Sequence, residues 1–561
     1  MKRFYFLAIV ILLGTIAKAQ TFGWAEQFSG NNPNSGFSLA RSPSGELIVG
    51  GTFEGAVDFD PGDGTFILTS FGGKDAFIAK TDIDGNLIWA KQFGGNEDDY
   101  VRNVYCDLEG NIFITGAFQG TSDMDPGDGT FNLTSFGGKD IFINELDEDG
   151  NFVWAGQFAG TLDGTGTCIA VSPSGNIYFS GYFIGVFDFD PGAANYYLTA
   201  ASQAIYTGKL NSNHEIVWAK TMGGPLFDYC ESMSLDEEEN IYTTGSFENV
   251  ADFDPGDSAI YLTSAGGNDI YVNKLNSDGE YVWAKQMSGP EDEFGEGIVY
   301  DQVGNIYITG YFKSTVDFDP DTSSSYMTSV DDYDVFIEKL DTDGNMLWAR
   351  QIGGVDSQGG QAITLDNDNN VYCTGHFKGT ADFDPGIETY EMTSFGDFDI
   401  FVEKLEENGT FVWSADMGGA LFDRGLAIIT DNQSNVFTTG WFAGTADFEP
   451  GDNSYYLTTS GEYNCFLSKL GTDILGVEQN NATTNVSLFP NPATDEFSIE
   501  FKDVSANVSV IIYDVEGKVV FQDNYSFSQY VTIQSNFDPG IYFVEIKTSN
   551  GHKDLIKLIQ E

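Results

Sequence analysis

Apolar and polar residues alternate along most of this chain in short stretches that are separated by turns. Between residues 101 and 158, the segments NIFITGAF, DIFINELD and NFVWAGQF alternate β-branched or aromatic residues with polar ones, and the turn DEDG joins the last two. Alternation with a period of two predicts half-buried strands, and turns that contain Gly or Asn predict hairpins. Together with the short apolar segment RNVYCD, this stretch is predicted to form four antiparallel strands.

This four-stranded stretch recurs with a nearly fixed period. Tryptophan marks the fourth strand, and successive copies are 64 or 65 residues apart, at Trp24, Trp89, Trp154, Trp218, Trp283, Trp348 and Trp413. Tandem units of this kind pack on their neighbours, because one unit cannot bury its apolar face alone. Four antiparallel strands per repeat predict the blade of a β-propeller, with an added excursion between the second and third strands that carries DFDPG or a variant of it.

The two ends of the repeat region predict how it closes. The last repeat, near residues 426–470, has three strands and no tryptophan strand, whereas TFGWAEQF around Trp24 precedes the first repeat and has no blade of its own. We therefore expect residues 20–471 to form a seven-bladed β-propeller that is closed by its N-terminal strand. An open solenoid is the alternative architecture.

The segments on either side of the repeats differ from them in character. Two basic residues precede an apolar run that ends near Ile16, and the small-x-small sequence AKA follows, so residues 1–19 are predicted to be a signal peptide. The run is too short to span a bilayer and no later run is long enough, so we expect no transmembrane segment in the mature chain. Polar residues 472–485 predict a linker, and residues 486–561 again alternate as strands do.

Composition narrows the class of partner. The chain has 25 Lys and Arg against 85 Asp and Glu, a net charge of −60, which repels phosphate backbones and argues against nucleic acid. The five cysteines occupy non-equivalent positions in the repeats, which favours free buried thiols over a disulfide framework. We expect a monomer with an acidic, solvated surface.

The repeats resemble a known family. GNIYITG, DIFINELD, GNFVWA and a Gly-Gly pair after the tryptophan strand are similar to the bacterial beta-propeller repeats called SBBP, over about residues 21–470. This resemblance implies a propeller and no common activity. The DFDPG excursion departs from the family pattern.

The C-terminal segment resembles the sorting domain of the type IX (Por) secretion system. The similarity is carried by Pro490, Asn491 and Pro492 at its start, by Asp514, Gly517 and Lys518 in YDVEGK, by Gly540 and Tyr542 in PGIYFVEI, and by Lys553. The resemblance implies that residues 486–561 form a small β-sandwich, which the secretion machinery recognises for passage across the outer membrane. It further implies a protein that is secreted or attached to the outer cell surface.

Catalytic motifs were sought and none was found. The patterns GxSxG, HExxH and the P-loop are absent, and none of the three histidines has a nucleophile near it in sequence that would suggest a catalytic relay. Nearly uniform repeats favour binding over catalysis, since a catalytic site needs one cluster of unlike residues. We therefore expect an exported, non-enzymatic binding or adhesion module that requires no cofactor. An extracellular hydrolase or lyase acting on polysaccharide is the alternative.

The DFDPG segments are candidate calcium sites. In an extended strand the first and third residues share a face, so the two carboxylates of each copy would converge, and calcium prefers such oxygen ligands. The alternative is a tight Asp-Pro-Gly turn in which the first Asp bonds to backbone amides. The candidate ligands are Asp58, Asp60, Asp123, Asp125, Asp188, Asp190, Asp252, Asp254, Asp317, Asp319, Asp382, Asp384, Asp447 and Glu449.

A ligand face is predicted at the loops whose sequences vary between repeats, because the strands that carry these loops keep the same pattern. The loops from the fourth strand of one repeat to the first strand of the next vary, as in GGNEDDY, GGPLFDY and SGPEDEF. Their aromatic residues could stack on a glycan or bind a protein, and the alternative is that they plug the tops of the blades. The residues predicted for this face are Asp99, Tyr100, Phe227, Asp228, Tyr229, Glu293, Phe294, Phe422 and Asp423.

Overall fold

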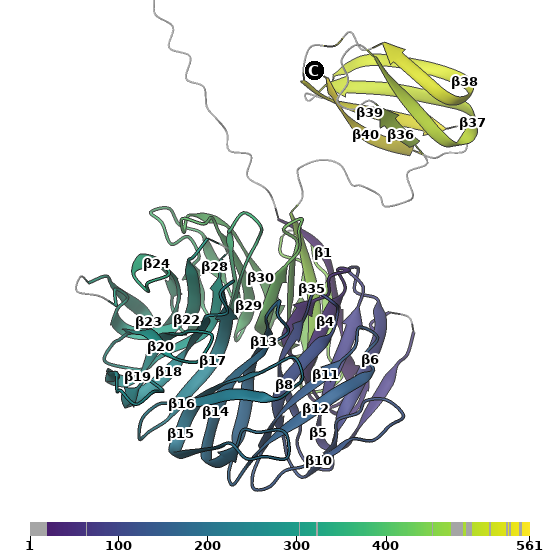
Figure 1. Cartoon of the computed structure of the whole chain (residues 1–561). Helices are drawn as coiled ribbons and strands as arrows, with labels where there is room; N and C mark the ends of the chain where they lie inside the picture. Colours follow the sequence, from purple (N-terminus) through teal and green to yellow (C-terminus); the bar gives the residue numbers. More distant parts are fainter. Residues whose placement is uncertain are drawn as a thin grey trace, which may run out of the picture. The chain divides into compact units, whose positions relative to one another are not determined.

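The computed structural model of the chain describes residues 20–472, except positions 63, 302, 321–323 and 452, and residues 486–489, 496–514, 518–534, 537, 540–548 and 553–560. The chain divides into two compact units, Met1–Thr472 and Asp473–Glu561, which we call the repeat unit and the C-terminal unit (Figure 1). The described residues form strands and no helix, which confirms the all-β prediction, and so no described helix could cross a membrane. The predicted signal peptide and residues 473–485 of the predicted linker lie outside the described residues.

Within each repeat, four strands pair side by side in chain order. In the second repeat they are β7 (Tyr100–Cys106), β8 (Ile112–Phe118), β11 (Asp140–Leu146) and β12 (Phe152–Gly160), and all pairs are antiparallel. Every residue of β8 and β11 is buried. The two middle strands therefore have both faces covered, which explains why their sequences are richer in apolar residues than simple alternation requires.

We number these four-stranded sheets 1 to 7 by the order of their first strands, so that the one above is sheet 2. The other six have the same strand order: β3 (Asn34–Arg41), β4 (Leu47–Asp58), β5 (Ile67–Thr81) and β6 (Leu87–Gly95) in sheet 1; β13 (Gly164–Val171), β14 (Ile177–Asp188), β15 (Tyr197–Leu210) and β16 (Ile216–Met222) in sheet 3; β17 (Asp228–Leu235), β18 (Ile241–Asp252), β19 (Tyr261–Leu275) and β20 (Tyr281–Met287) in sheet 4; β21 (Glu293–Tyr300), β22 (Ile306–Asp317), β23 (Tyr326–Leu340) and β24 (Met346–Gly354) in sheet 5; β25 (Gln358–Leu365), β26 (Val371–Phe377), β29 (Asp399–Leu405) and β30 (Phe411–Gly419) in sheet 6; and β31 (Arg424–Thr430), β32 (Val436–Phe442), β35 (Asn464–Thr472) and β1 (Gln20–Gln27) in sheet 7.

The DFDPG excursions lie between neighbouring sheets. In sheets 1, 3, 4 and 5 they lengthen the second and third strands, and elsewhere they form the separate hairpins β9 (Thr121–Asp123) with β10 (Asn132–Thr134), β27 (Thr380–Asp382) with β28 (Glu391–Thr393), and β33 (Thr445–Asp447) with β34 (Tyr456–Thr458). The short β2 (Ser29–Gly30) pairs with β4, and the ends of β6, β12, β24 and β30 pair with the excursion of the following sheet. The excursions therefore link each of these sheets to the previous one.

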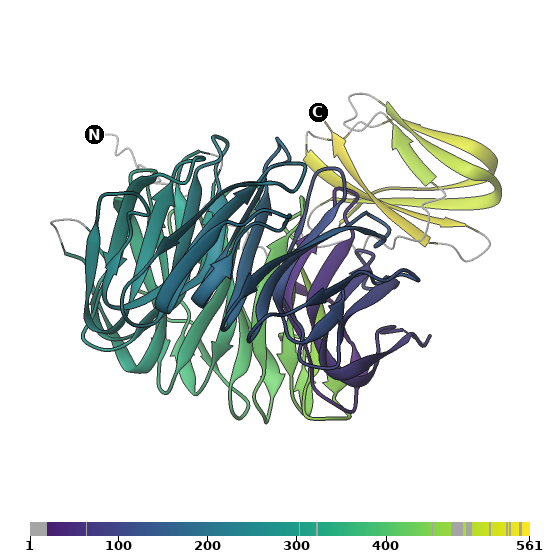
Figure 2. The ribbon, with the colours of Figure 1, turned by 60° about the horizontal axis from the view of Figure 1, so that its bottom comes forward.

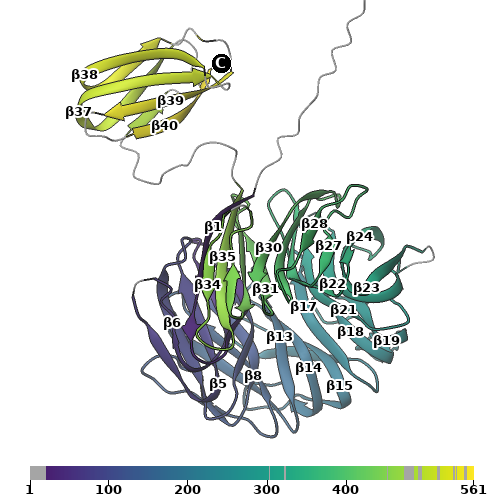
Figure 3. The same ribbon diagram turned by 180° about the vertical axis from the view of Figure 1, so that it is seen from behind.

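The first strands of the seven sheets contact one another in chain order. β3 contacts β7, the contacts continue through β13, β17, β21 and β25 to β31, and β31 in turn contacts β3. β1 pairs antiparallel with β35, from Gln20 opposite Thr472 to Gln27 opposite Phe466, so the segment around Trp24 is the fourth strand of sheet 7. β1 and β35 come from opposite ends of the repeat unit in sequence, and Figures 2 and 3 show them side by side.

The apolar core lies between the sheets, and the repeat tryptophans take part in it. The indole Nε1 of Trp24 donates a hydrogen bond of 3.3 Å to the carbonyl oxygen of Ile83, in the turn between the third and fourth strands of the next sheet. The same bond to a carbonyl 59 residues later links Trp218 to Ser277, Trp283 to Thr342 and Trp348 to Glu407. Phe437 and Cys465 of sheet 7 share a cluster with Phe53 of sheet 1, so the core also joins the first and last sheets.

All five cysteines are free thiols, as the sequence predicts. Cys106 is half-buried and the other four are buried. The Sγ atoms of Cys168 and Cys230 are 3.8 Å apart, which is a van der Waals and weak hydrogen-bond distance between sheets 3 and 4. The thiols therefore serve as small core residues.

The C-terminal unit has a core of its own. β36 (Val486–Phe489), β37 (Glu496–Asp514), β39 (Gly540–Thr548) and β40 (Lys553–Gln560) pair in that order, and β38 (Val519–Gln534) also pairs with β37. The buried side chains include Phe497, Ile512 and Val544. Of the residues that carry the sorting-domain resemblance, Asp514 ends β37, Lys518 precedes β38, Gly540 and Tyr542 lie in β39 and Lys553 begins β40, whereas Pro490, Asn491, Pro492 and Gly517 lie outside the described residues.

Candidate functional site

The first aspartate of each DFDPG copy is held in a turn. Asp58 Oδ1 accepts hydrogen bonds from the backbone N–H groups of Asp60, at 3.1 Å, and Phe66, at 2.7 Å. The bond from the third residue to the first acid recurs in the other copies: Asp125 to Asp123, Asp190 to Asp188, Asp254 to Asp252, Asp319 to Asp317, Asp384 to Asp382 and Glu449 to Asp447. This bonding is that of the Asp-Pro-Gly turn. Over the described residues, no three His, Cys, Asp or Glu side chains gather as a metal would require.

The acids of the predicted ligand face lie inside the protein rather than on its surface. Asp99, Asp228, Glu293 and Asp423 are at most 1% exposed. Each accepts a hydrogen bond from the backbone N–H four residues earlier, at 2.7 Å from Gly95, 2.6 Å from Gly224, 3.0 Å from Gly289 and 2.8 Å from Gly419. These acids therefore shape the loops that lead into the first strands.

Three of these acids face a second carboxyl group from the preceding sheet, in the pairs Asp75 with Asp99, Asp269 with Glu293, and Asp399 with Asp423. We call them the junction pairs. Gly94 shows how closely the first pair lies, because a Cβ at that position would be 2.8 Å from Asp99 Oδ2 and 3.0 Å from Asp75 Oδ1. The Gly-Gly pair after the tryptophan strand is therefore required by close approach.

Burial raises the pKa of the junction carboxyls. Desolvation raises the pKa of Asp99 to about 7, and the neighbouring Asp75 adds to the shift. Desolvation also raises the pKa of Asp423 to about 7 and that of Asp399 to about 8, with Asp423 adding to the latter. Oδ1 of Asp75 and Oδ1 of Asp399 are buried and accept no hydrogen bond from any described residue. Burial of these carboxyl groups therefore favours their protonated form.

The aromatic residues of the predicted face are partly exposed and lie among further aromatic rings. Tyr229 packs on Tyr182 with ring centroids 5.2 Å apart, and Phe294 packs on Tyr311 at 4.9 Å. Tyr311 continues to Tyr333 at 5.3 Å. Phe422 contacts Trp441, at 4.9 Å, as well as Phe398 and His376. Tyr100 accepts a cation–π contact from Lys139 at 4.5 Å, and Phe227 is 50% exposed.

A β-bulge occurs at the same place in the first strand of every sheet. The ladder skips one residue in β3, β7, β13, β17, β21, β25 and β31, and the skipped residues are Phe37, Arg102, Thr167, Glu231, Glu296, Gln361 and Leu426. A bulged residue has no partner across the ladder, and its side chain is turned away from the regular alternation. These seven residues, with Arg424, are called the central cluster below.

Charged members of the central cluster meet across non-neighbouring sheets. The guanidinium of Arg102 in sheet 2 lies 3.8 Å from Glu231 Oε2 in sheet 4, and its Cζ is 5.3 Å from the ring centroid of Phe37 in sheet 1. Arg424 in sheet 7 donates a 2.6 Å hydrogen bond to Gln361 Oε1 in sheet 6. Side chains from five sheets thus converge on one region, where the first strands adjoin.

Glu296 is the fourth charged residue of the central cluster, and it interacts electrostatically with the other three. Burial raises the pKa of Glu296 in sheet 5 to about 8, Glu231 raises it further, and Arg424 and Arg102 oppose the shift. Burial also raises the pKa of Glu231, and Arg102 opposes that shift. A hydrogen bond with Tyr311 connects Glu296 to the aromatic residues described above. The region therefore combines two arginines, two glutamates whose pKa is raised by burial, and a border of aromatic rings.

The sequence prediction did not include the central cluster. Its signal is the one strand position at which successive repeats carry Phe, Arg, Thr, Glu, Glu, Gln and Leu. That variation is visible once the repeats are superposed, but a regular alternation cannot show which residue is bulged.

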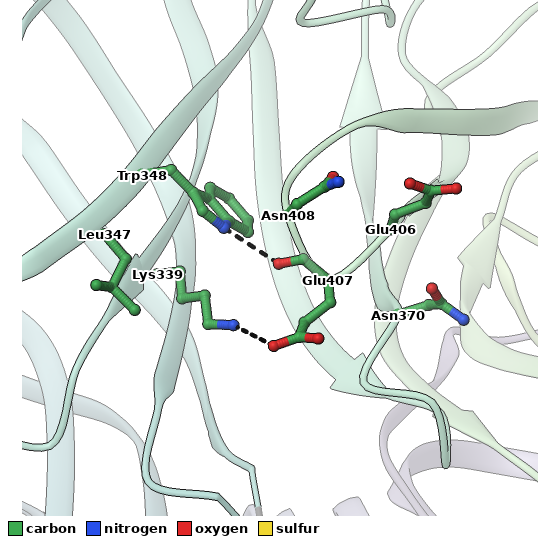
Figure 4. A pocket seen from close by; sticks show the side chains of 7 residues that line it. All are labelled: Lys339, Leu347, Trp348, Asn370, Glu406, Glu407 and Asn408. Carbon is green, nitrogen blue, oxygen red and sulfur yellow. Dashed lines mark hydrogen bonds and ion pairs between the residues drawn. The ribbon is translucent and has the colours of Figure 1, made fainter.

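A separate pocket of about 460 Å³ lies on the tryptophan side of sheets 5 and 6 (Figure 4). Its walls include Trp348, whose Nε1 donates to the carbonyl oxygen of Glu407 at 3.1 Å, and Lys339, whose Nζ lies 2.8 Å from Glu407 Oε1. These groups satisfy one another and repeat a contact that other sheets also make. The pocket is therefore a consequence of sheet packing.

Two segments of the chain match family models. Residues 487–561 match the secretion system C-terminal sorting domain, and residues 88–117 match the beta-propeller repeat, which confirms both resemblances. The chain thus carries propeller repeats and a sorting domain for export by the type IX secretion system to the cell surface or beyond.

More distant similarities are partial. An uncharacterized WD repeat-containing protein of Acanthamoeba polyphaga mimivirus is 22% identical over 75% of this chain, and an endo-acting ulvan lyase of Formosa agariphila is 34% identical over 16% of it. The chain spans 36% and 18% of the lengths of these two relatives. A solved structure described as a candidate gluconolactonase aligns with 81% of this chain and 100% of its own, at 9% identity. Its TM-score of 0.25 is too low to indicate a shared fold.

Proposed function

We propose that this protein is an exported, non-enzymatic binding module that holds a saccharide at the central cluster of a seven-bladed β-propeller, closed by its N-terminal strand and followed by a small C-terminal β-sandwich. The ring is supported by the contacts of the first strands, which run through seven sheets and return from β31 to β3, and by the pairing of β1 with β35. Unlike side chains from several sheets meet where the first strands adjoin, and a few convergent polar groups beside apolar ones are typical of a ligand site.

One observation carries the proposal, namely that unlike side chains of five sheets, four of them polar, converge beside half-buried aromatic rings. Sugars present apolar faces that stack on aromatic rings and hydroxyl groups that need polar partners. Tyr182, Tyr311 and Trp441 supply the first kind of contact, and Arg102, Glu231 and Gln361 supply the second. The type IX secretion machinery is the other partner, through the C-terminal unit. We propose that the exported protein acts as a monomer.

The experiment that tests the proposal is a glycan array with the full exported chain. We expect binding to at least one saccharide, and we expect Glu231→Ala and Gln361→Ala to weaken it at least tenfold, because each removes a polar partner at the cluster. Glu97→Ala, at an exposed loop position, is the matched control and is expected to bind normally. Equal melting temperatures would show that the variants are folded. Normal binding by both cluster variants would contradict the assigned site.

A polysaccharide hydrolase is the second candidate, favoured by Glu231 and Glu296. Burial raises the pKa of Glu296 to about 8, and glycosidases use two carboxyl groups, one of which has a raised pKa and acts as the acid. Incubation of each bound saccharide with the protein, followed by chromatography, distinguishes the two candidates. Products that disappear with Glu296→Gln would establish the enzyme.

Chelation tests whether calcium binds at the DFDPG copies. We expect chelation to change the melting temperature by less than about 3 °C, because Oδ1 of each first acid already accepts backbone hydrogen bonds. Seven weak calcium sites would each contribute up to about 1.4 kcal/mol at millimolar calcium. A fall of about 10 °C in differential scanning calorimetry, reversed by added calcium, would instead support the metal sites.

A further inference from the structure

Arginine is scarce in this chain, and the central cluster contains two of the few. The sequence has five arginines, at positions 3, 41, 102, 350 and 424, against 85 acidic residues. Arg102 and Arg424 come from sheets 2 and 7, and both belong to the region where the first strands adjoin. Two guanidinium groups in one region of a strongly acidic protein are a charge arrangement that folding alone does not require.

Neither guanidinium makes a hydrogen-bonded pair with a carboxylate among the described residues, although Glu231 and Glu296 lie in the same cluster. The nearest carboxylate oxygen to Arg102 is 3.8 Å away, beyond hydrogen-bond distance, and the Arg102 side chain is 36% exposed. Arg424 donates to a neutral amide oxygen, that of Gln361, and its Nε is buried without a partner among the described residues. A planar guanidinium with an unfilled edge is suited to a bidentate anion.

The two arginines also act on each other. Burial is the main reason why the pKa of Arg424 is lowered, and the positive charge of Arg102 contributes in the same direction. Glu296 opposes this lowering, while burial in turn raises the pKa of Glu296 to about 8. A bound anion would relieve the repulsion between the two guanidinium groups.

We propose, on the basis of the saccharide-binding function given above, that the ligand is an anionic saccharide whose carboxylate or sulfate group contacts Arg102 and Arg424. The sugar ring stacks on the neighbouring aromatic residues, of which Tyr182 is influenced electrostatically by Glu231 and Arg102, and Tyr311 by Glu296 and Arg424. A uronate and a sulfate ester present the same chemistry to a guanidinium, namely a delocalised anion with paired oxygens. The negative surface opposes approach of a polyanion at long range, so selectivity arises from the short-range pairing.

The test is an array that holds three chemical classes: neutral glucans, galactans and xylans; uronate-rich alginate and pectin fragments; and sulfated galactans. It is read at 0.15 M salt or above, where the roughly 8 Å Debye length screens the −60 surface. We expect binding to the uronate or the sulfated class, at least tenfold above the neutral class. Comparison of these two classes identifies the anion.

Substitution of the arginines completes the test. Isothermal titration with the best anionic saccharide is expected to show at least tenfold weaker binding for Arg102→Gln and Arg424→Gln, whereas Arg350→Gln, far from the cluster beside Trp348, is expected to bind as the parent does. Unchanged melting temperatures would exclude misfolding of the variants. If Arg424→Gln destabilised the fold, Arg424→Lys would replace it, because lysine keeps the positive charge but not the planar guanidinium.

The outcomes separate the two proposals. Binding to neutral saccharides only, or equal binding to all three classes, would overturn the anionic ligand and leave the saccharide-binding function standing. Binding to none of them would overturn both. Anion preference that survives both arginine substitutions would show that the charge is recognised elsewhere.

Discussion

Raising the pH from about 4 to about 8 is expected to lower the melting temperature of the repeat unit by about 10 °C. The cause is the set of buried carboxyls, among them Asp99, Asp399 and Asp423, whose folded pKa lies near 7 or 8. Below pH 4 these carboxyl groups are protonated in both the folded and the unfolded state, so their contribution to stability is fully present. Between pH 4 and the folded pKa only the unfolded state releases the protons, and stability falls. Above the folded pKa this contribution levels off.

The size of this effect follows from the shift. A folded pKa of about 7 against an unfolded value near 4 corresponds to at most about 4 kcal/mol for one carboxyl group, and several such groups act together. The measurement is calorimetry across that pH range. Asp99→Asn and Asp423→Asn are expected to flatten the profile, because an amide cannot titrate. Glu97→Gln removes the same charge at an exposed position and is expected to leave the slope unchanged. A melting temperature that rises between pH 4 and 7 would contradict the assignment.

Deletion of β1 is expected to lower the melting temperature of the repeat unit by more than 10 °C, with precipitation on heating. The deletion removes the ladder from Gln20 to Gln27, the core residue Ala25 and the indole of Trp24, and it leaves β35 as an open edge. Trp24 is half-buried, so its loss costs part of the roughly 3 to 5 kcal/mol of a fully buried tryptophan, and an unprotected edge strand promotes association.

Two comparisons sharpen this second experiment. A chain that ends at Thr472 is expected to melt as the full chain does, because the C-terminal unit has a separate core. A synthetic peptide of residues 20–31, added to the deleted protein, is expected to restore the melting temperature by strand addition. If the deleted protein melts normally, β1 is not needed to complete sheet 7.

The sequence allowed the strands and the pairing of distant segments to be predicted, because both follow from periodicity. The spacing of the tryptophans defines the repeat, and a last repeat without its fourth strand left Trp24 as the segment to supply it. The pairing of β1 with β35 agrees with that expectation. Turn chemistry was also accessible, since Asp-Pro-Gly allows few conformations and Asp58 adopts the bonding of the turn.

The site was less accessible for two physical reasons. Asp99 and Asp423 were predicted to lie on a surface because acids are usually exposed. Both are buried, because a backbone N–H four residues earlier donates to each and desolvation favours the protonated carboxyl group. Arg102 and Glu231 were overlooked because a β-bulge changes the direction of a side chain without changing the alternation around it.

The pairing of β1 with β35 also sets the earliest point in synthesis at which sheet 7 can be completed. Its partners are about 450 residues apart, as in the contact of Thr21 with Gly471. The first strand to be synthesised must therefore wait, unpaired, until the last strand of the repeat unit has been made. Sheet 7 thus cannot be completed before Thr472 has been made, and a chain that ends before β35 has no partner for its first strand.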